Sequence, residues 1–303
     1  MTNLYIQALG VRMNATIGII THNRGKIISK CLDGIRNQTF KPKMIVIVDT
    51  SDNDVTEKIV RKFKLPIKYI HLKKRIRQPP ARNLILKNTK TDILAFLDDD
   101  AVPKADWLEN IVMGFGFGND IVAVAGPSVN CDINLKPIVN YKYTDRKQNF
   151  VNSCGDVRFN CAWIPSKPTE CSAMIGANMS FLTDELRSVG GFYDFYKEGY
   201  GFREENSPQM ALIKKGKKFM YMPKAFVWHI KTRIGGAEKD YEHFYLCGKY
   251  HRIFADKFFP KWKSRLSWIF WSVSPPCVWL CLALAIYRLD ISIIKWHKGL
   301  WGF

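Results

Sequence analysis

Short apolar runs alternate with amphipathic stretches through the first 125 residues of the chain. Each apolar run has the length of a buried strand, and each stretch between two runs repeats its apolar residues at helical spacing. This alternation predicts an α/β fold, with a mostly parallel sheet flanked by helices. The predicted strands are 15–20, 43–48, 67–72, 93–97 and 121–125, and the predicted helices are 26–36, 55–63, 81–88 and one beginning near 107.

Polar and acidic residues follow the predicted strands. Thr21 and Asn23 come after the first strand, Asp49 after the second, and Asp98–Asp100 after the fourth. Open α/β sheets bind ligands beyond the carboxyl ends of their strands. We therefore expect these turns to converge on one ligand at one edge of the sheet.

Three consecutive acids, Asp98, Asp99 and Asp100, come directly after an apolar strand. Like charges at such close quarters are costly unless a cation lies among them. Alternate residues of an extended chain point the same way, so Asp98 and Asp100 can face one cation. Carboxylate oxygens suit Mg²⁺ or Mn²⁺. The alternative is a solvated acidic loop, with Asp106 as the cap of the following helix.

The regular pattern fails between residues 129 and 170, where we expect a variable insert of irregular loop or short strands. Order returns at 173–181, and further elements are predicted at 184–189, 204–215, 219–222 and 225–229. These patterns divide the chain into an N-terminal tail at 1–13, an α/β domain at 14–235 and a C-terminal tail at 236–303.

Gly114, Gly116 and Gly118 form a G-x-G-x-G motif. A dinucleotide site needs this motif directly after a strand and before a helix. Here the glycines follow a predicted helix, so the motif indicates helix termination.

A resemblance to one protein family extends from about residue 15 to residue 235. Each matching segment is short, and it is their common order that makes the match specific. The segments are ITHNR at 20–24, CLDGIRNQT at 31–39, IVIVDTSD at 45–52, ARN at 81–83, FLDDD at 96–100, GAN at 176–178, VGGF at 189–192, REEN at 203–206 and PKAFVWH at 223–229. In these segments the chain resembles the family 2 glycosyltransferases, enzymes of the GT-A fold.

The resemblance implies a nucleotide-sugar donor site and a role for each matching residue. Contacts with the donor are implied for Thr21, Asn23, Asp49, Arg82, Asp98, Asp99, Gly176 and Asn178, and Gly176 and Asn178 would also border the acceptor. Asp98 and Asp100 would hold Mg²⁺ or Mn²⁺, and His229 would approach the metal or the diphosphate. Negative charge grows on the departing diphosphate, and a bound divalent cation stabilises it.

Sugar transfer also needs a base for the acceptor hydroxyl, and a carboxylate facing the cleft can serve. We predict Glu205 for this role, with Glu204 in reserve, and a single displacement that inverts the anomeric carbon. The family pattern has Glu-Asp at this place, whereas this chain has Glu204-Glu205 followed by Pro208, which is tolerated only in a first helical turn.

Ordinary structural roles are the alternatives for these residues. They are turn capping for Asn23 and Asp49, a surface position for Arg82, a favourable acidic first turn for Glu204 and Glu205, a strand-end hydrogen bond for His229 and a satisfied buried amide for Asn178.

The C-terminal tail is basic and aromatic. Residues 214–303 hold 17 lysines and arginines against five acids, and a hydrophobic segment without charge covers 266–287. That length could cross a bilayer core of about 30 Å, but Pro275-Pro276 would break a plain helix. We favour monotopic anchoring on the cytoplasmic face of the membrane, with a true span or a soluble dimer face as alternatives. An acceptor linked to polyprenyl, or another glycan, would suit this location.

The net charge of +19 keeps a different class of function open, a nucleic-acid-binding protein. That alternative explains the basic tail but not the ordered acidic and asparagine turns, so we expect no nucleic-acid partner. A membrane-bound pseudoenzyme that binds sugar nucleotide without turnover is a second alternative. A metal phosphatase or nucleotidyltransferase that uses Asp98–Asp100 is the nearest enzymatic one.

Overall fold

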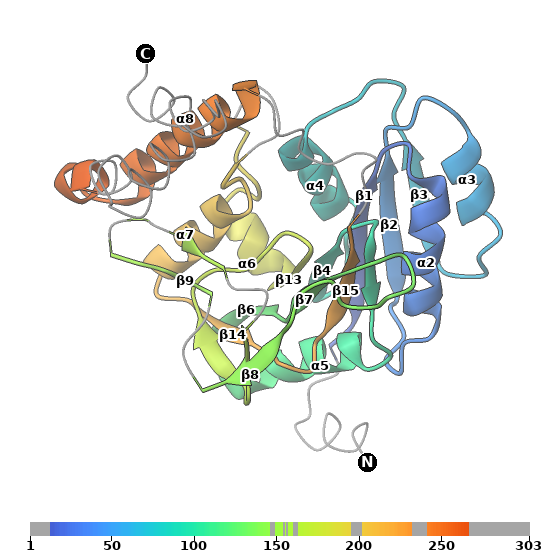
Figure 1. Cartoon of the computed structure of the whole chain (residues 1–303), viewed down its shortest axis with the longest axis horizontal. Helices are drawn as coiled ribbons and strands as arrows, with labels where there is room; N and C mark the ends of the chain where they lie inside the picture. The colour runs from blue at the N-terminus through green and yellow to red at the C-terminus, as the bar shows by residue number, and fades with distance from the viewer. Residues whose placement is uncertain are drawn as a thin grey trace.

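The computed structural model describes residues 13–145, 149–153, 155, 157–159, 163–194, 202–231 and 241–266, without the side chains of 241–245 (Figure 1). The predicted N-terminal tail up to residue 12 and the hydrophobic segment beyond Leu266 lie outside the described residues. The membrane topology predicted for that segment therefore stays a prediction.

The first half of the chain follows the predicted order closely, because its apolar runs are short and sharply bounded. The elements are β1 (Ala15–Thr21), α2 (Gly25–Arg36), β2 (Met44–Asp49), α3 (Val55–Val60), β3 (Ile67–His71), α4 (Gln78–Lys87) and β4 (Ile93–Leu97). Helix α4 begins three residues before its predicted start, at Gln78. Its two prolines occupy the first turn, where the missing N–H groups have no partner in a helix anyway.

The second half begins with β5 (Ala101–Pro103), α5 (Trp107–Gly114), the 3₁₀ turn η1 (Phe115–Phe117) and β6 (Ile121–Ala125). Helix α5 ends at Gly114, as the helix-termination interpretation of the glycine motif requires. Where the structure describes the predicted insert, its strands are short: β7 (Ser128–Cys131), β8 (Lys142–Thr144), β9 (Phe150–Val151), β10 (Val157–Arg158), β11 (Trp163–Pro165) and β12 (Thr169–Cys171).

The remaining elements complete the sheet and add a C-terminal helix. They are β13 (Asn178–Leu182), α6 (Thr183–Ser188), α7 (Asn206–Lys214), β14 (Lys218–Tyr221), β15 (Val227–Ile230) and α8 (Tyr241–Phe258). None of the helices within the described ranges combines the length and the apolar character that crossing a bilayer requires.

A mixed eight-stranded sheet forms the centre of the molecule, in the order β12-β14-β6-β13-β4-β1-β2-β3. Strands β4, β1, β2 and β3 are parallel, whereas β13 runs antiparallel to both of its neighbours. A smaller sheet, β5-β15-β7, pairs His229 with Ala101, one residue after the acidic triplet. This pairing brings the two distant segments together at the end of β4.

Apolar side chains fill both faces of the large sheet. One cluster joins the sheet to α2 and α5, and a second joins its other face to α4, α6 and α7. Figure 1 shows α2 and α4 on opposite sides of the strands. Strands β1, β2, β4 and β6 are almost entirely buried, so their continuous apolar runs belong to strands that are covered on both faces.

Asn178 on β13 connects three parts of this core. Its amide nitrogen donates to the carbonyls of Pro127 and Ala225, at 3.0 and 2.8 Å, and its oxygen accepts from the indole of Trp107, at 2.9 Å. The residue is fully buried. These bonds tie β13 to α5 and to the segments that precede β7 and β15.

We expect Asn178→Ala to lower the free energy of unfolding by about 3 kcal/mol or more, because three buried groups lose their partner. Urea unfolding measures the change. Ser180→Ala on the same strand is the matched control: Ser180 is fully buried and its hydroxyl has no hydrogen-bond partner among the described residues. Its removal should leave stability unchanged or raise it, because a buried hydroxyl without a partner is itself unfavourable. Equal effects of the two substitutions would contradict the role given to Asn178.

Candidate active site

The acidic triplet lies in a tight turn between β4 and β5. The turn is closed by a backbone hydrogen bond from Ala101 to the carbonyl of Asp98, at 3.1 Å. The amide of Ile230 on β15 donates to the carbonyl of Asp100, at 2.8 Å. Both ends of the turn are therefore anchored to β structure, so the carboxylates are held on a rigid support.

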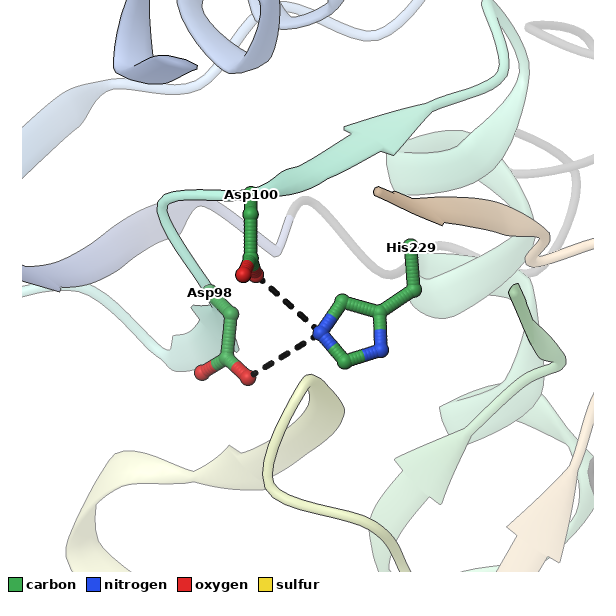
Figure 2. A group of neighbouring side chains, drawn as sticks. All are labelled: Asp98, Asp100 and His229. Atoms are coloured by element: carbon green, nitrogen blue, oxygen red, sulfur yellow. Dashed lines mark ion pairs between the residues drawn. The ribbon is translucent and has the colours of Figure 1, made fainter. Parts of the chain in front are cut away.

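Asp98, Asp100 and His229 form a cluster with the geometry of a metal site (Figure 2). Their ligand atoms all lie within 4.8 Å of one another. His229 Nε2 lies 3.1 Å from Asp100 Oδ1 and 4.0 Å from Asp98 Oδ2. Asp100 Oδ1 is buried and lacks a hydrogen bond of normal geometry within the described structure. Two carboxylates, one imidazole and an unsatisfied buried oxygen fit a divalent cation such as Mg²⁺ or Mn²⁺.

Asp99 is not part of this cluster, and each of its oxygens accepts a hydrogen bond. It accepts from the hydroxyl of Thr21, at 2.7 Å, and from the guanidinium of Arg24, at 2.8 Å. The same nitrogen of Arg24 also donates to Asp100 Oδ2, at 2.8 Å. Thr21 and Arg24 belong to the first β-to-α turn, so β1 and β4 meet at their carboxyl ends as expected.

Burial and neighbouring charges both shift the pKa values of Asp99, Asp100 and His229, and in each group burial is opposed by a neighbour of opposite charge. Burial, with the charge of Asp100, raises the pKa of Asp99 to about 7 against the opposing effect of Arg24. Burial would also raise the pKa of Asp100, but His229 and Arg24 outweigh it and lower that pKa. Burial would lower the pKa of His229, and the two carboxylates raise it instead. The site is therefore a compact set of coupled charges.

A cavity of about 530 Å³ opens beside the cluster. Seven of the predicted site residues contribute to its wall: Thr21, Arg82, Asp98, Asp99, Asp100, Gly176 and His229. They come from β1, α4, the acidic turn, the loop before β13, and β15. Segments from across the chain thus meet at one concave site.

Three predicted donor contacts do not line the cavity. Asn178 is fully buried and its amide bonds to Trp107, Pro127 and Ala225, so in this structure it supports the core, and its contact with donor or acceptor stays a prediction. Asn23 is exposed, and its side chain joins two turns through Asp52. Asp49 is fully buried and is bound by Ser51 and by the hydroxyl of Tyr69. In this structure Asn23 and Asp49 support the turns rather than face the cavity.

Arg82 and Glu204 form a buried ion pair next to the cavity, with side chains 4% and 2% exposed. Burial raises the pKa of Glu204 to about 7, and Arg82 opposes that rise. A Cβ atom at Gly176 would lie 2.7 Å from a guanidinium nitrogen of Arg82. Glycine at 176 therefore leaves room for Arg82 to lie between the cavity and Glu204.

The two predicted bases differ in environment. Glu204 is occupied by Arg82, whereas Glu205 is only partly buried and precedes α7. Burial raises the pKa of Glu205, and Arg82 opposes the rise. Neither carboxylate lines the cavity itself. Pro208 falls in the first turn of α7, as predicted, because a proline there costs the helix no hydrogen bond.

Several residues of the cavity wall were not predicted from the sequence. They are polar or basic and come from the turns after β1, β2 and β3 and from the end of β15: His22, Arg24, Thr50, Arg75, Gln78 and Lys231. The signal that could have found them is position, since five lie within four residues of a strand end at the ligand-binding edge and Gln78 begins the helix that follows β3.

Comparison with known proteins places the chain in a family. The model of glycosyl transferase family 2 matches residues 16–172. The chain belongs to glycosyl transferase family 2. This confirms the family to which the sequence motifs pointed. The match covers β1 to β12 and includes the acidic turn.

Individual relatives support the same assignment. Glycosyltransferase AglE of Haloferax volcanii is 33% identical over 111 residues, which are 34% of this chain and 36% of the relative. The O-antigen chain rhamnosyltransferase RfbN of Salmonella typhimurium is 22% identical over 246 residues, 79% of this chain and 73% of the relative. This chain thus spans about a third of the length of AglE.

Solved structures share the fold. Mannosyltransferase PcManGT from Pyrobaculum calidifontis, in complex with GDP-Man and Mn²⁺, matches with a TM-score of 0.59 at 17% identity and covers 99% of this chain and 95% of its own. At that identity the likeness concerns the fold alone, and it confirms the predicted GT-A class.

The cluster geometry predicts direct binding of a divalent cation. We expect Asp100→Asn to weaken Mn²⁺ binding by at least about tenfold, because one of two clustered carboxylates loses its charge. Calorimetric titration of the chain with Mn²⁺ alone measures this. Asp106→Asn is the matched control, since Asp106 precedes α5 and does not line the cavity. Equal affinities of wild type and Asp100→Asn would contradict a metal site at this turn.

Proposed function

We propose that this chain is an inverting, metal-dependent glycosyltransferase that moves a sugar from a nucleoside diphosphate sugar to a hydroxyl group. The observation that carries the proposal is the cluster of Asp98, Asp100 and His229 in the wall of a cavity of about 530 Å³. The chain belongs to a glycosyltransferase family, and a structure that shares its fold was solved with GDP-Man and Mn²⁺.

The proposed donor lies in this cavity with its diphosphate toward the cluster. Asp98, Asp100 and His229 would hold the metal, which when bound would stabilise the charge that develops on the departing diphosphate. The cavity wall also carries Arg75 and Lys231, whose positive charges suit phosphate oxygens. Thr50 and Gln78 offer uncharged polar groups for the remainder of the nucleotide.

Glu205 is the proposed base. It would accept the proton of the acceptor hydroxyl as the oxygen attacks the anomeric carbon, on the face opposite the leaving diphosphate. Glu204 is unsuited to that role because its carboxylate is buried against Arg82. Through its pair with Glu204, Arg82 would hold the segment next to Glu205 in place. A single displacement would invert the configuration at the anomeric carbon.

We expect Glu205→Gln to lower kcat by about 10²- to 10⁴-fold while the KM for the donor changes little, because only the proton acceptor is removed. Donor hydrolysis, with water in place of the acceptor, is followed with UDP-, GDP- and dTDP-sugars and Mn²⁺. The wild type should release a nucleoside diphosphate and a sugar of inverted configuration. Release of sugar 1-phosphate would contradict glycosyl transfer, and an unchanged kcat in Glu205→Gln would contradict the base.

The proposed acceptor is a glycan, linked to a lipid or to the cell surface, at the cytoplasmic side of the membrane. One relative is named as an O-antigen chain rhamnosyltransferase. Residues 261–266 are helical and expose Trp262 and Leu266, which are 62% and 47% accessible. They lie four residues apart on one helical face, with Lys261 and Arg265 beside them. This pattern fits the interface of an anionic bilayer.

We expect the protein to float with vesicles of phosphatidylcholine and phosphatidylglycerol, and the double variant Trp262→Glu/Leu266→Glu to bind them several-fold more weakly. Phe117→Glu is the control, because Phe117 is 53% exposed but lies on η1, far along the chain from the basic tail. Equal binding by the double variant would show that residues 261–266 do not contact the membrane.

A further inference from the structure

Arg24 lies in the candidate site without a role in the chemistry assigned so far. It follows the first strand and immediately precedes α2. Its side chain is 13% exposed, and its Nη1 atom lies 2.8 Å from Asp99 Oδ1 and 2.8 Å from Asp100 Oδ2. One guanidinium nitrogen therefore bridges two consecutive carboxylates of the acidic turn.

The bridge determines which way Asp100 faces. Asp100 Oδ2 is taken by Arg24, and Asp100 Oδ1 lies 3.1 Å from His229 Nε2 in the cluster. A carboxylate is planar, so fixing one oxygen fixes the direction of the other. Arg24 thereby keeps one oxygen of Asp100 turned toward Asp98 and His229.

Asp99 holds the other end of this arrangement. It is 4% exposed, and its two oxygens accept from Thr21 and Arg24. The residue at the centre of the triplet is therefore an anchor for Arg24 and Thr21 rather than a member of the cluster. This explains why three acids are present where the cluster uses two.

We propose that Arg24 is a positioning residue of the metal site, which bridges Asp99 and Asp100 so that Asp100 presents one oxygen to the cation. The inference rests on the proposed metal dependence. Arg24 also reduces the formal charge of the triplet from −3 to −2, a charge that one divalent cation neutralises while His229 is uncharged. Supporting partners of this kind set metal affinity through the orientation of the ligands.

The direction in which Mn²⁺ affinity changes when Arg24 is removed distinguishes positioning of Asp100 from simple repulsion of the cation. If Arg24 only repelled the cation, its removal would strengthen Mn²⁺ binding, because one nearby positive charge is lost. If Arg24 positions Asp100, its removal weakens binding in spite of that gain. The two possibilities predict opposite changes in the dissociation constant.

The experiment is a calorimetric titration of the full chain with Mn²⁺, without nucleotide, for the wild type, Arg24→Gln and Arg24→Lys. We expect Arg24→Gln to bind Mn²⁺ about 10- to 100-fold more weakly. Arg24→Lys keeps the positive charge, but the lysine nitrogen ends one bond short of the Nη position. Its affinity for Mn²⁺ should therefore lie between those of the wild type and Arg24→Gln. Circular dichroism and thermal unfolding verify that each variant is folded.

Lys231→Gln is the matched control. Lys231 also lines the cavity, and its positive charge acts on His229. Its loss should leave Mn²⁺ binding unchanged or make it tighter, since only repulsion is removed. A decrease in affinity for Arg24→Gln together with no decrease for Lys231→Gln would support positioning.

Binding by Arg24→Gln that equals or exceeds the wild type would overturn the inference and leave the proposed function intact. If Arg24→Gln does not fold, Arg24→Lys decides: weaker binding supports positioning, and wild-type affinity overturns it. A wild type that binds no Mn²⁺ would overturn the inference and the proposed metal dependence together.

Discussion

The mutual repulsion of Asp98, Asp99 and Asp100 is the constraint on which the site depends. Burial strengthens repulsion between like charges and removes the water that would otherwise screen it. Partners from distant parts of the chain offset this repulsion: Arg24 lies in the first turn, 75 residues before Asp99, and His229 lies on β15. An acidic turn of this kind is stable only where the sheet has already brought those segments together.

The order of strands and helices was predictable because it follows from the pattern of neighbouring residues in the sequence. Apolar runs such as 93–97 are bounded by polar turns, and their alternation with helices implies parallel neighbours. The acidic turn was predictable for the same reason, since three adjacent acids directly after a buried strand indicate a bound cation. The antiparallel insertion of β13 between β4 and β6 was not predictable, because it depends on pairing between residues 54 to 89 positions apart in the chain.

Individual site residues were predicted less well because polar side chains have several possible partners. Asn178 stands in a matching motif, but Trp107, Pro127 and Ala225 take all its hydrogen bonds. Asp49 likewise turns to Ser51 and Tyr69. Arg24 stands in the matching segment 20–24, but its motif did not assign it a partner, since an arginine in a polar turn is usually solvated. Whether such residues face a ligand or the protein is decided by tertiary contacts that spacing alone does not encode.

The adjacent acids Glu204 and Glu205 show how a departure from the family pattern can leave the chemistry in place. Arg82 needs a buried counter-ion, and Glu204 provides it, so one carboxylate of the pair is committed to structure. The other stays partly exposed at the start of α7, where Asn206, Ser207 and Pro208 form the first turn. Pro208 fixes its own backbone there without costing a hydrogen bond. The added methylene of Glu205 relative to aspartate thus lengthens the reach of the proposed base from a rigid support, and the pairing of Glu204 with Arg82 excludes the competing carboxylate.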